Sequence, residues 1–404
     1  MGERKPAMKN TAASIIADTS GKTRVEIRRG EDPISWVGST PQLIRVGAAA
    51  LPITYIGPVE TVTEYRGQGY ARQALETSLT QQRQSSATLA LLHGIDDFYP
   101  KFGFAQAGPE QYIQLTRLER STALPEGWRA RPFVLTDLPR LQQIYDHSST
   151  QITGATVRAP DGAAWQQLAQ TVDDTSDDSC RVVENTAGEI GGYAWRVRSC
   201  WYVRLCERYG PDDLVIGEAI AANPVAADAL LATCRAWARE EAVERGRPIE
   251  KVTLPLPQIG PLADAALLQD ATLLTNCFRD GSFMAQVLDL SRFLSAMVPE
   301  FERRLRQMSP KFVGDICFRT REDAVVLFVN AGSHIHVGRS KQAQEEVRIT
   351  LPQTILARLA LGGFPPEDLL SRLATPLSDQ SYALCCCLFP RRRPHIFAVD
   401  RGID

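Results

Sequence analysis

The stretch Val59–Arg72, VETVTEYRGQGYAR, decides how the N-terminal part of the chain is organised. It begins with β-branched residues typical of a strand, turns through Arg66–Gly69 and enters an amphipathic helix at Tyr70. Such a turn leaves backbone N–H groups pointing outward at the positive end of the helix dipole, where anions bind well. Gly67 and Gly69 carry no Cβ and let an anion approach closely. We therefore expect a pyrophosphate site, and the alternative is a plain strand–turn–helix connection.

The spacing within this stretch is more specific than its glycines. Arg66-x-x-Gly69-x-Ala71 resembles the acetyl-CoA signature of the GNAT acetyltransferases. A dinucleotide fingerprint would need a further glycine, and a P-loop would need Gly-Lys-Ser/Thr, which does not follow. The resemblance implies that acetyl-CoA, the co-substrate, binds to this stretch and to a neighbouring strand. The residues concerned are Val59, Glu60, Thr61, Arg66, Gly67, Gln68, Gly69, Tyr70, Ala71, Arg72, Gly94 and Ile95.

A second motif follows the apolar run Ala87–Leu92, which is typical of a buried central strand. Phe98–Phe104 reads FYPKFGF and is similar to the aromatic segment that GNAT enzymes carry after a strand that splays away from the motif strand. The resemblance implies that Tyr99 protonates the departing thiolate. A phenol of pKa ~10 suits a thiol of similar acidity. The alternative for Tyr99 is an interface aromatic with a solvated hydroxyl.

Composition narrows the classes of partner. A chain of 404 residues with 44% hydrophobic residues is expected to form two or three domains. The net charge of −2 gives no electrostatic case for nucleic acid or an acidic membrane surface. Without an apolar run of about 18 residues or a signal peptide, we expect no membrane and a cytoplasmic location. The nine cysteines form no C-x-x-C pair and the five histidines are scattered, so we expect reduced thiols and no metal.

The order of elements predicts a mixed α/β (α+β) fold with three domains. Residues 1–122 form a GNAT domain, and residues 123–287 repeat its element order around a second mixed central sheet. The strand–helix junction at Ala221–Val225 lacks Arg-x-x-Gly, and Pro224 removes a donor that a phosphate would need. We interpret this domain as a degenerate, structural GNAT domain, with an unrelated α/β domain as the alternative. Residues 288–404 resemble a sterol-carrier-protein-like α+β domain.

Three local predictions concern the ends of these domains. Ala7–Ala17 is expected to form a short helix, Leu214–Ala221 one strand, and Tyr382–Leu388 an apolar strand. GNAT folds open with a strand and two helices before the strand expected at Thr23, and the chain has little room for them. Because those helices form part of the acceptor wall in the family, the acceptor site is open, completed by another domain or subunit, or damaged.

The three-domain order resembles the Eis-type acetyltransferases. It implies direct acetyl transfer to a primary amine of a small aminoglycoside- or polyamine-like acceptor, and assembly as a homo-oligomer, a hexamer. A base must deprotonate the amine. The family uses the terminal carboxylate, here on Asp404, while Asp400 and Glu60 are alternatives, and Asp404 could equally be a frayed end. The second hypothesis is a CoA- or lipid-binding protein of the same architecture that has lost catalysis.

Overall fold

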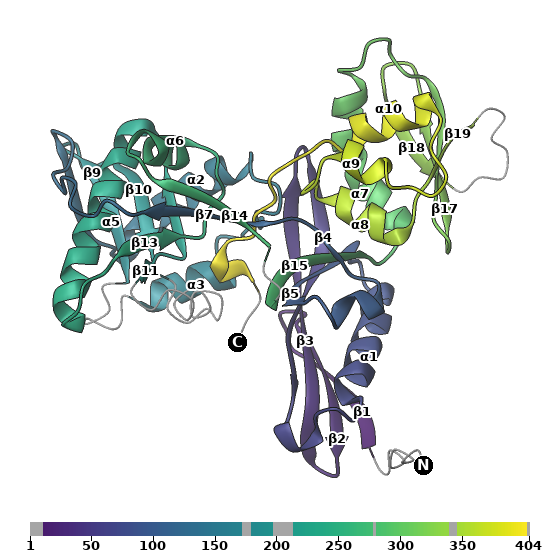
Figure 1. Cartoon of the computed structure of the whole chain (residues 1–404), viewed down its shortest axis with the longest axis horizontal. Helices are drawn as coiled ribbons and strands as arrows, with labels where there is room; N and C mark the ends of the chain where they lie inside the picture. Colours follow the sequence, from purple (N-terminus) through teal and green to yellow (C-terminus); the bar gives the residue numbers. More distant parts are fainter. Residues whose placement is uncertain (1–10, 172–178, 197–212, 278–279, 339–345, 402–404) are drawn as a thin grey trace.

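The computed structural model describes residues 11–171, 179–196, 213–277, 280–338 and 346–401, and Figure 1 shows them in three lobes. In this described part, the sheet of the first lobe has the order β1-β2-β3-β4-β5-β15-β6. Its strands are β1 (Thr11–Ala17), β2 (Thr23–Arg29), β3 (Asp32–Val46), β4 (Ala49–Thr61), β5 (Leu89–Ile95), β6 (Ala105–Gln106) and β15 (Asp280–Val287). Only β4 and β5 pair in parallel, while the other neighbours are antiparallel. Helix α1 (Tyr70–Gln84) covers one face through a buried stripe that includes Ala74, Leu75, Ser78 and Leu79, as its helical spacing predicted.

The helix predicted for Ala7–Ala17 is wrong for the residues that are described, because β1 occupies Thr11–Ala17. This strand pairs with β2 along its whole length, so the edge of the sheet supplies the hydrogen bonds that a helix would otherwise form internally. Residues 18–22 then form a turn, in which the Asp18 carboxylate accepts from the backbone of Ser20 and Lys22. The chain therefore has a first strand, and it passes directly to β2 without the two helices of the family.

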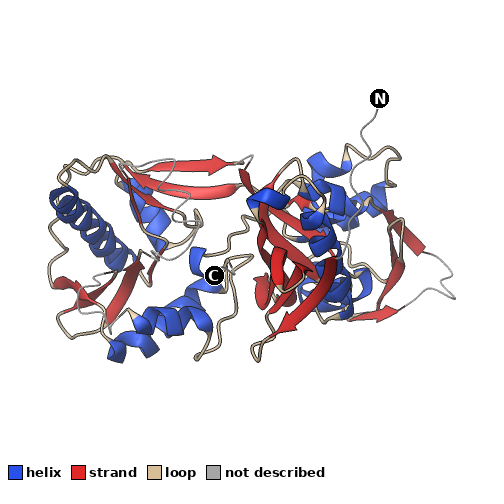
Figure 2. Ribbon diagram, turned by 90° about the horizontal axis from the view of Figure 1, so that it is seen from below, coloured by secondary structure: helices blue, strands red, loops and turns tan. Residues whose placement is uncertain are grey.

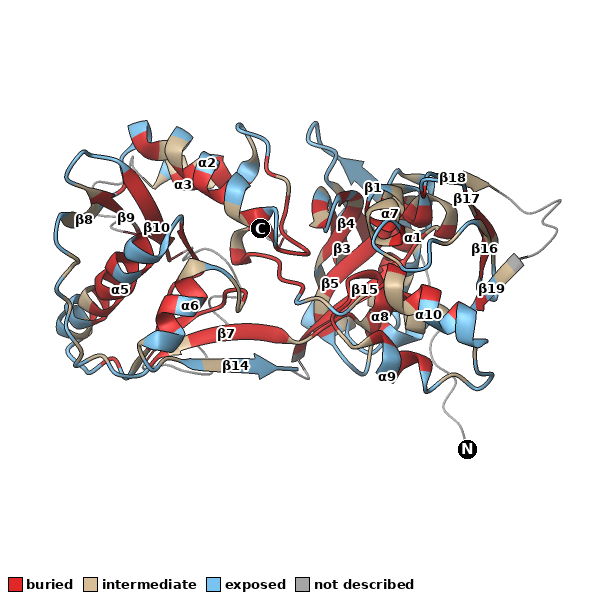
Figure 3. Cartoon of the chain, turned by 90° about the horizontal axis from the view of Figure 1, so that it is seen from above, coloured by how far each residue is buried: buried red, intermediate tan, exposed pale blue. Residues whose placement is uncertain are grey.

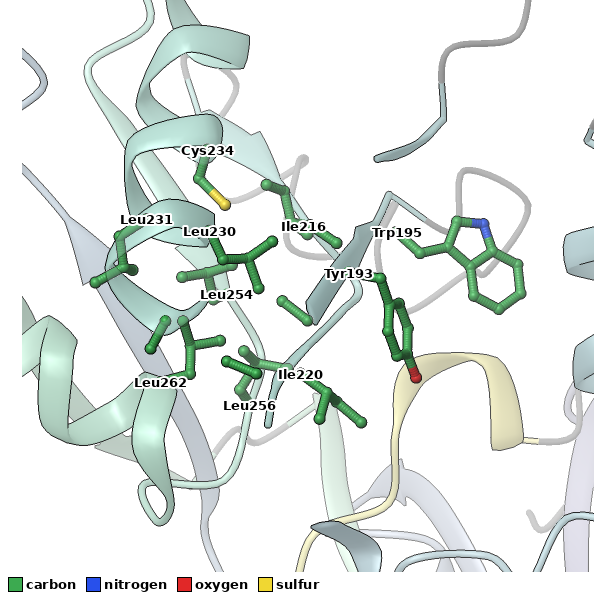
Figure 4. Packing of buried hydrophobic residues seen from close by; sticks show 14 of the residues in the cluster. Tyr193, Trp195, Ile216, Ile220, Leu230, Leu231, Cys234, Leu254, Leu256 and Leu262 are labelled. Atoms are coloured by element: carbon green, nitrogen blue, oxygen red, sulfur yellow. The ribbon is translucent and has the colours of Figure 1, made fainter. Parts of the chain in front are cut away.

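The second lobe contains two sheets, with the orders β12-β10-β9-β8 and β11-β13-β7-β14 over the described residues. Their strands are β7 (Glu110–Leu115), β8 (Trp128–Pro132), β9 (Cys180–Asn185), β10 (Ile190–Trp195), β11 (Asp213–Val215), β12 (Glu218–Ala221), β13 (Lys251–Leu254) and β14 (Thr272–Asn276). The helices are α2 (Leu138–Ser149), α3 (Ala163–Gln170), α5 (Pro224–Arg245) and α6 (Pro261–Leu268). In Figure 4, Leu230 and Cys234 of α5 pack against Ile216, Leu254 and Leu256.

The single strand predicted for Leu214–Ala221 is wrong. The segment is two short strands in different sheets: β11 runs parallel to β13, and β12 runs antiparallel to β10. Ile216 and Gly217 lie between them, and Ile216 N–H donates to the Thr253 carbonyl. A continuous apolar pattern cannot reveal that a strand changes partner half-way, because both halves are buried.

The first two lobes exchange strands. β7 comes from the N-terminal segment but lies between β13 and β14 of the second lobe, and β15 follows the second lobe but lies between β5 and β6 of the first. Figure 3 shows β7 as a buried strand beside the exposed β14. The division of the chain at residues 122 and 287 stays a prediction, and the exchange ties the two lobes together by backbone pairing on both sides.

The third lobe packs α7 (Leu290–Leu305) against a sheet of order β18-β17-β16-β19. The strands are β16 (Gly314–Arg319), β17 (Ala324–Val329), β18 (Ile335–Gly338) and β19 (Glu346–Thr350), followed by α8 (Gln353–Ala360), α9 (Pro366–Leu370) and α10 (Asp379–Leu388). The strand predicted at Tyr382–Leu388 is wrong, because these residues belong to α10. The Ser378 hydroxyl caps this helix by accepting from Ser381 N–H, and this polar start overrides the β-like apolar run. The likeness of the third lobe, residues 288–404, to a sterol-carrier-protein-like domain stays a prediction.

The tail, residues 390–401, leaves α10 and passes between the second lobe and the other two (Figures 1 and 2). It is largely buried at its end, where His395, Phe397, Asp400 and Arg401 are at most 6% exposed. His395 N–H donates to the Thr153 carbonyl of the second lobe. In the part of the chain that the structure describes, no helix is long and apolar enough to cross a membrane.

Candidate functional site

Strands β4 and β5 diverge near their ends and open a slot. They pair only over Ile53–Tyr55 and Leu89–Leu91, although β4 continues to Thr61 and β5 to Ile95. A cleft of about 830 Å³ lies here. Its lining is Val59, Glu60, Thr61, Tyr65, Arg66, Gly67, Gln68, Gly69, Tyr70, Ala71, Arg72, Ile95, Phe98, Tyr99 and Lys101. All the residues assigned to the cofactor from the sequence, except Gly94, line this one cleft together with Tyr99.

A bulge directs β4 into the slot. The pairing of β3 with β4 shifts register so that Gly38 faces Gly57 and Pro58. A Cβ on Gly38 would lie 2.4 Å from the Gly57 carbonyl oxygen, so only glycine fits this close approach. A bulge bends its strand and increases the local twist. Because the pairing with β5 ends at Tyr55, no described strand pairs with the edge of Val59–Thr61 that faces away from β3.

The turn between β4 and α1 presents backbone donors to the cleft. Gly67 and Gly69 have left-handed φ values of 75° and 91°. The Arg66 Nε donates to the Thr61 carbonyl at 3.1 Å, and Gln68 Nε2 donates to the Glu64 carbonyl at 3.2 Å, so both side chains brace the turn. No described side chain caps the N-terminus of α1. The first-turn N–H groups are therefore available to an anion such as a pyrophosphate.

Tyr99 forms the inner wall of the cleft. Its ring lies edge-on to Phe98 at 5.1 Å and to Phe104 at 6.0 Å, and the residue is 8% exposed. Gly94 lies behind it, because a Cβ there would come within 2.1 Å of the Tyr99 ring. Burial raises the pKa of Tyr99 to about 12, so the phenol stays protonated at neutral pH. The hydroxyl can therefore donate a proton but is a poor base.

The three carboxylates considered as bases have different surroundings. Glu60 is exposed on β4 and lines the cleft. Asp400 is buried, and its carboxylate accepts from Arg158 Nη2 at 2.8 Å and from Nε at 3.0 Å. Burial raises the pKa of Asp400 against the opposing effect of Arg158. This bound carboxylate serves to anchor the tail to the second lobe. Asp404 lies outside the described residues.

A buried polar network that the sequence did not reveal joins the tail to the first lobe. The Tyr55 hydroxyl lies 2.5 Å from His93 Nδ1, and His93 Nε2 lies 2.5 Å from Glu110 Oε1. Arg401 Nη2 donates to Glu110 Oε2 at 2.9 Å. Burial and then Arg401 lower the pKa of His93 to about 4, against the opposing effect of Glu110. His93 is therefore neutral at the point where β4 and β5 separate. The sequence offered one signal for His93, namely its position directly before Gly94, which was assigned to the cofactor site.

Burial works to raise the pKa of Glu110, but Arg401 and His93 together hold it below its ordinary value. The four residues come from β4, β5, β7 and the tail, so no local pattern groups them. Because His93 precedes Gly94, which packs on Tyr99, the network supports the wall of the cleft from the face opposite α1.

The comparisons with known proteins agree with this geometry. Residues 17–107 match the family model described as an acetyltransferase (GNAT) domain. No curated protein sequence matches the chain. Among solved structures, a GCN5-related N-acetyltransferase from Anabaena variabilis is 18% identical, with a TM-score of 0.65 over 93% of this chain and 89% of that one.

Two further structures share the fold. A conserved protein of unknown function from Enterococcus faecalis, described as a probable N-acyltransferase, is 14% identical with a TM-score of 0.65 over 93% of this chain and 88% of that chain. Eis1 from Mycobacterium abscessus is 16% identical with a TM-score of 0.58 over 93% and 89%. At these identities the likeness shows the fold alone. Residues 17–107 thus match a GNAT acetyltransferase domain, and the chain shares its fold with these proteins over most of its length.

Proposed function

We propose that the protein is an N-acetyltransferase that uses acetyl-CoA and acetylates a primary amine of a small molecule. The observation that carries the proposal is a single cleft that joins an uncapped, glycine-rich helix start, an unpaired strand edge and a buried tyrosine. The N–H groups of Gly67–Arg72 would hold the pyrophosphate. The free edge of Val59–Thr61, beside Ile95, would hold the pantetheine arm by backbone hydrogen bonds.

The chemistry requires a proton donor, an oxyanion site and a base. Tyr99 supplies the proton to the leaving sulfur, since its phenol is neutral and the residue lines the cleft. Backbone N–H groups along the free edge of β4 are suited to hold the developing oxyanion. The amine attacks directly, because no cysteine lines the cleft among the described residues to form an acyl-enzyme. For the base we propose Asp404 or Glu60.

These two bases predict different kinetic losses. If Glu60 takes the proton, Glu60→Gln lowers kcat and deletion of residues 402–404 leaves it unchanged. If the terminal carboxylate takes it, deletion of residues 402–404 lowers kcat and Glu60→Gln does not. A pH–rate profile for each variant shows which carboxylate sets the acidic limb. A profile that neither change alters would remove both from the mechanism.

The acceptor is proposed to enter from the face of the first sheet that α1 does not cover. A cleft of about 710 Å³ lies there between β3, residues 156–170 of the second lobe and the tail. Thr40 on its wall is the register partner of Tyr55, the last β4 residue paired with β5. The second lobe and the tail would then replace the helices that are missing between β1 and β2.

The charge of this second cleft guides the choice of acceptors. Its described lining contains Lys22, Arg158 and Asp400, besides four glutamines. An acceptor with several positive charges would need several free carboxylates, whereas Asp400 is bound by Arg158. A test panel should therefore include amines of single charge beside aminoglycosides and polyamines.

The deciding experiment follows thiol release from acetyl-CoA with this panel, with Tyr99→Phe as the control variant. Release with at least one amine, and its loss in the variant, is expected. Tight acetyl-CoA binding without release on any amine would favour the second candidate, a binding protein that has lost catalysis. The absence of helices between β1 and β2 is the observation behind that alternative. By the resemblance to the Eis-type acetyltransferases, we also propose that the protein is a cytoplasmic homohexamer. Light scattering would test the hexameric state.

A further inference from the structure

Arg235 lies in the middle of α5 and is only 3% exposed. Its Nε is buried and has no hydrogen-bond partner. Among the contacts of the residues that the structure describes, none joins this guanidinium to a carboxylate or a carbonyl. Other buried arginines of the second lobe differ. Arg196 donates to both oxygens of Glu241, at 2.7 and 3.0 Å, and Arg158 donates to both oxygens of Glu218.

The neighbours of Arg235 add positive charge. Arg239, one helical turn further, donates to the carbonyls of Leu118 and Arg120, each at 2.9 Å, and to the Thr122 hydroxyl at 3.2 Å. Burial is the largest cause that lowers the pKa of Arg235; Arg120 and Arg239 lower it further, while Cys234 and Asp228 act in the opposite direction. The three guanidinium groups therefore repel one another beside the linker, residues 117–122, which joins β7 to the rest of the second lobe.

The nearby carboxylates are already engaged. Asp270 forms ion pairs with Arg117 and Arg120 and is half exposed. Asp228, on α5 itself, accepts from Gln269 at 2.6 Å. Glu119 on the linker is exposed. None of them forms an ion pair with Arg235 among the described contacts, so the cluster has an excess of positive charge.

A guanidinium removed from water without an acceptor is strongly unfavourable, far more so than an unpaired neutral group. Its planar fork of N–H groups matches the oxygens of a phosphate, and several arginines together are the usual way of holding one. We propose that Arg235, with Arg120 and Arg239, forms a binding site for a phosphate-type oxyanion between α5 and the linker. The bound anion would fasten the linker to α5. This site lies on the second lobe, and its existence does not depend on the proposed function.

Thermal unfolding of the full chain, without acetyl-CoA, tests the site with inorganic phosphate as the probe. In chloride buffer, millimolar phosphate should raise the Tm saturably, beyond the effect of sodium chloride at equal ionic strength. Arg235→Met should remove this response. The same variant should be at least as stable as the native chain in chloride, because it removes an uncompensated charge. A native Tm that responds equally to phosphate and chloride would overturn the proposal.

A matched substitution separates loss of the site from general damage. Arg196→Met removes a buried arginine that does have a carboxylate partner, so it should lower the Tm but keep the response to phosphate. Arg235→Lys keeps the charge without the fork and should retain only part of the response. If Arg235→Met instead lowers the Tm in every buffer and still responds to phosphate, the guanidinium has a partner within the protein and the proposal fails. Citrate in place of phosphate shows whether the site prefers a tetrahedral oxyanion to carboxylates. Equal stabilisation by both would contradict that assignment.

Discussion

Two junctions of this chain lead from a strand into a helix, and they differ in how the start of the helix is capped. Where β4 leads to α1, Gly67 and Gly69 adopt left-handed φ values and no described side chain caps the helix. Where β12 leads to α5, the Asn223 side chain accepts from Ala226 N–H at 2.9 Å, and Pro224 offers no N–H at all. The first junction is open to an anion and the second is satisfied internally. Binding chemistry therefore depends on a few capping residues, and the surrounding fold alone does not supply it.

The cavities near these two junctions also differ in volume and lining. In the first lobe the slot is about 830 Å³ and includes exposed polar groups of the turn. In the second lobe a cavity of about 210 Å³ lies beside Ala219–Ala222 and Leu256–Ala263, and Phe397 of the tail contributes to its wall. This smaller cavity is lined mostly by apolar side chains, and neither Asn223 nor Pro224 of the closed junction contributes to its wall.

The largest effect is expected from closing the open junction with Gly69→Val. A β-branched residue at a φ of 91° is strained, so the turn must rearrange and lose its aligned N–H groups. We expect acetyl-CoA affinity to fall by about 1,000-fold, since strain and two or more charge-assisted hydrogen bonds are lost together. Isothermal titration calorimetry measures this directly.

Gly188→Val is the matched control for this change. Gly188 has a φ of 78° and lies in the β9–β10 turn, with nothing within 4 Å of a built Cβ. The backbone strain is thus similar, but the residue is on the second lobe. Stability should fall and acetyl-CoA affinity should not. Equal loss of affinity in both variants would mean that the open junction is not the binding determinant.

Tyr99→Phe is expected to lower kcat by about 100-fold with little change in acetyl-CoA affinity, because it removes a proton donor and keeps the ring packing. The pKa of Tyr99 is raised to about 12, so the native phenol remains protonated well beyond the ordinary phenol pKa of about 10. The native pH–rate profile should therefore show no loss of activity through pH 10 that depends on Tyr99. Unaltered turnover in the variant at saturating substrate would exclude Tyr99 as the donor.

The contrast also shows what the sequence could predict. The residues of the open junction are contiguous, so the spacing of Arg66, Gly69 and Ala71 indicated a stretch that the structure places along one cleft, while their role in cofactor binding stays a prediction. The buried stripe of α1 followed from its period. The missing Arg-x-x-Gly before Pro224 likewise indicated a closed junction. The exchanged strands β7 and β15 and the His93–Glu110–Arg401 network join residues far apart in the chain. No local pattern encodes such partners, and a strand at the edge of a sheet, such as β1, is decided by the strand with which it pairs.

The tail contains one buried histidine, His395, and its Arg401 contacts a second, His93, and this predicts an acid-sensitive connection. Burial lowers the pKa of His93 to about 4 and that of His395 to about 3, below the ordinary value of about 6.5. Between pH 6.5 and 4.5 the unfolded chain therefore binds more protons than the folded one, and stability falls as the pH falls. Each imidazole contributes up to about 1.4 kcal/mol per pH unit.

Urea unfolding at pH 6.5, 5.5 and 4.5 measures this slope. Replacing His395 by Gln, which keeps a polar side chain but does not titrate, should reduce the slope by about half of the histidine contribution. A slope that is the same with and without His395 would show that its imidazole is already protonated in the folded state, contrary to its buried position.

The smallest effect is expected from Asn223→Ala at the closed junction. The change removes the acceptor for Ala226 N–H and should lower the free energy of unfolding by about 1 kcal/mol, measured by urea unfolding. Acetyl-CoA affinity should not change, since Pro224 still lacks an N–H and the Arg-x-x-Gly spacing is absent. If Asn223→Ala instead created a second acetyl-CoA site in calorimetry, the cap alone would separate the two junctions. An unchanged stoichiometry shows that the left-handed glycines and the arginine of the first junction are needed as well as a free helix start.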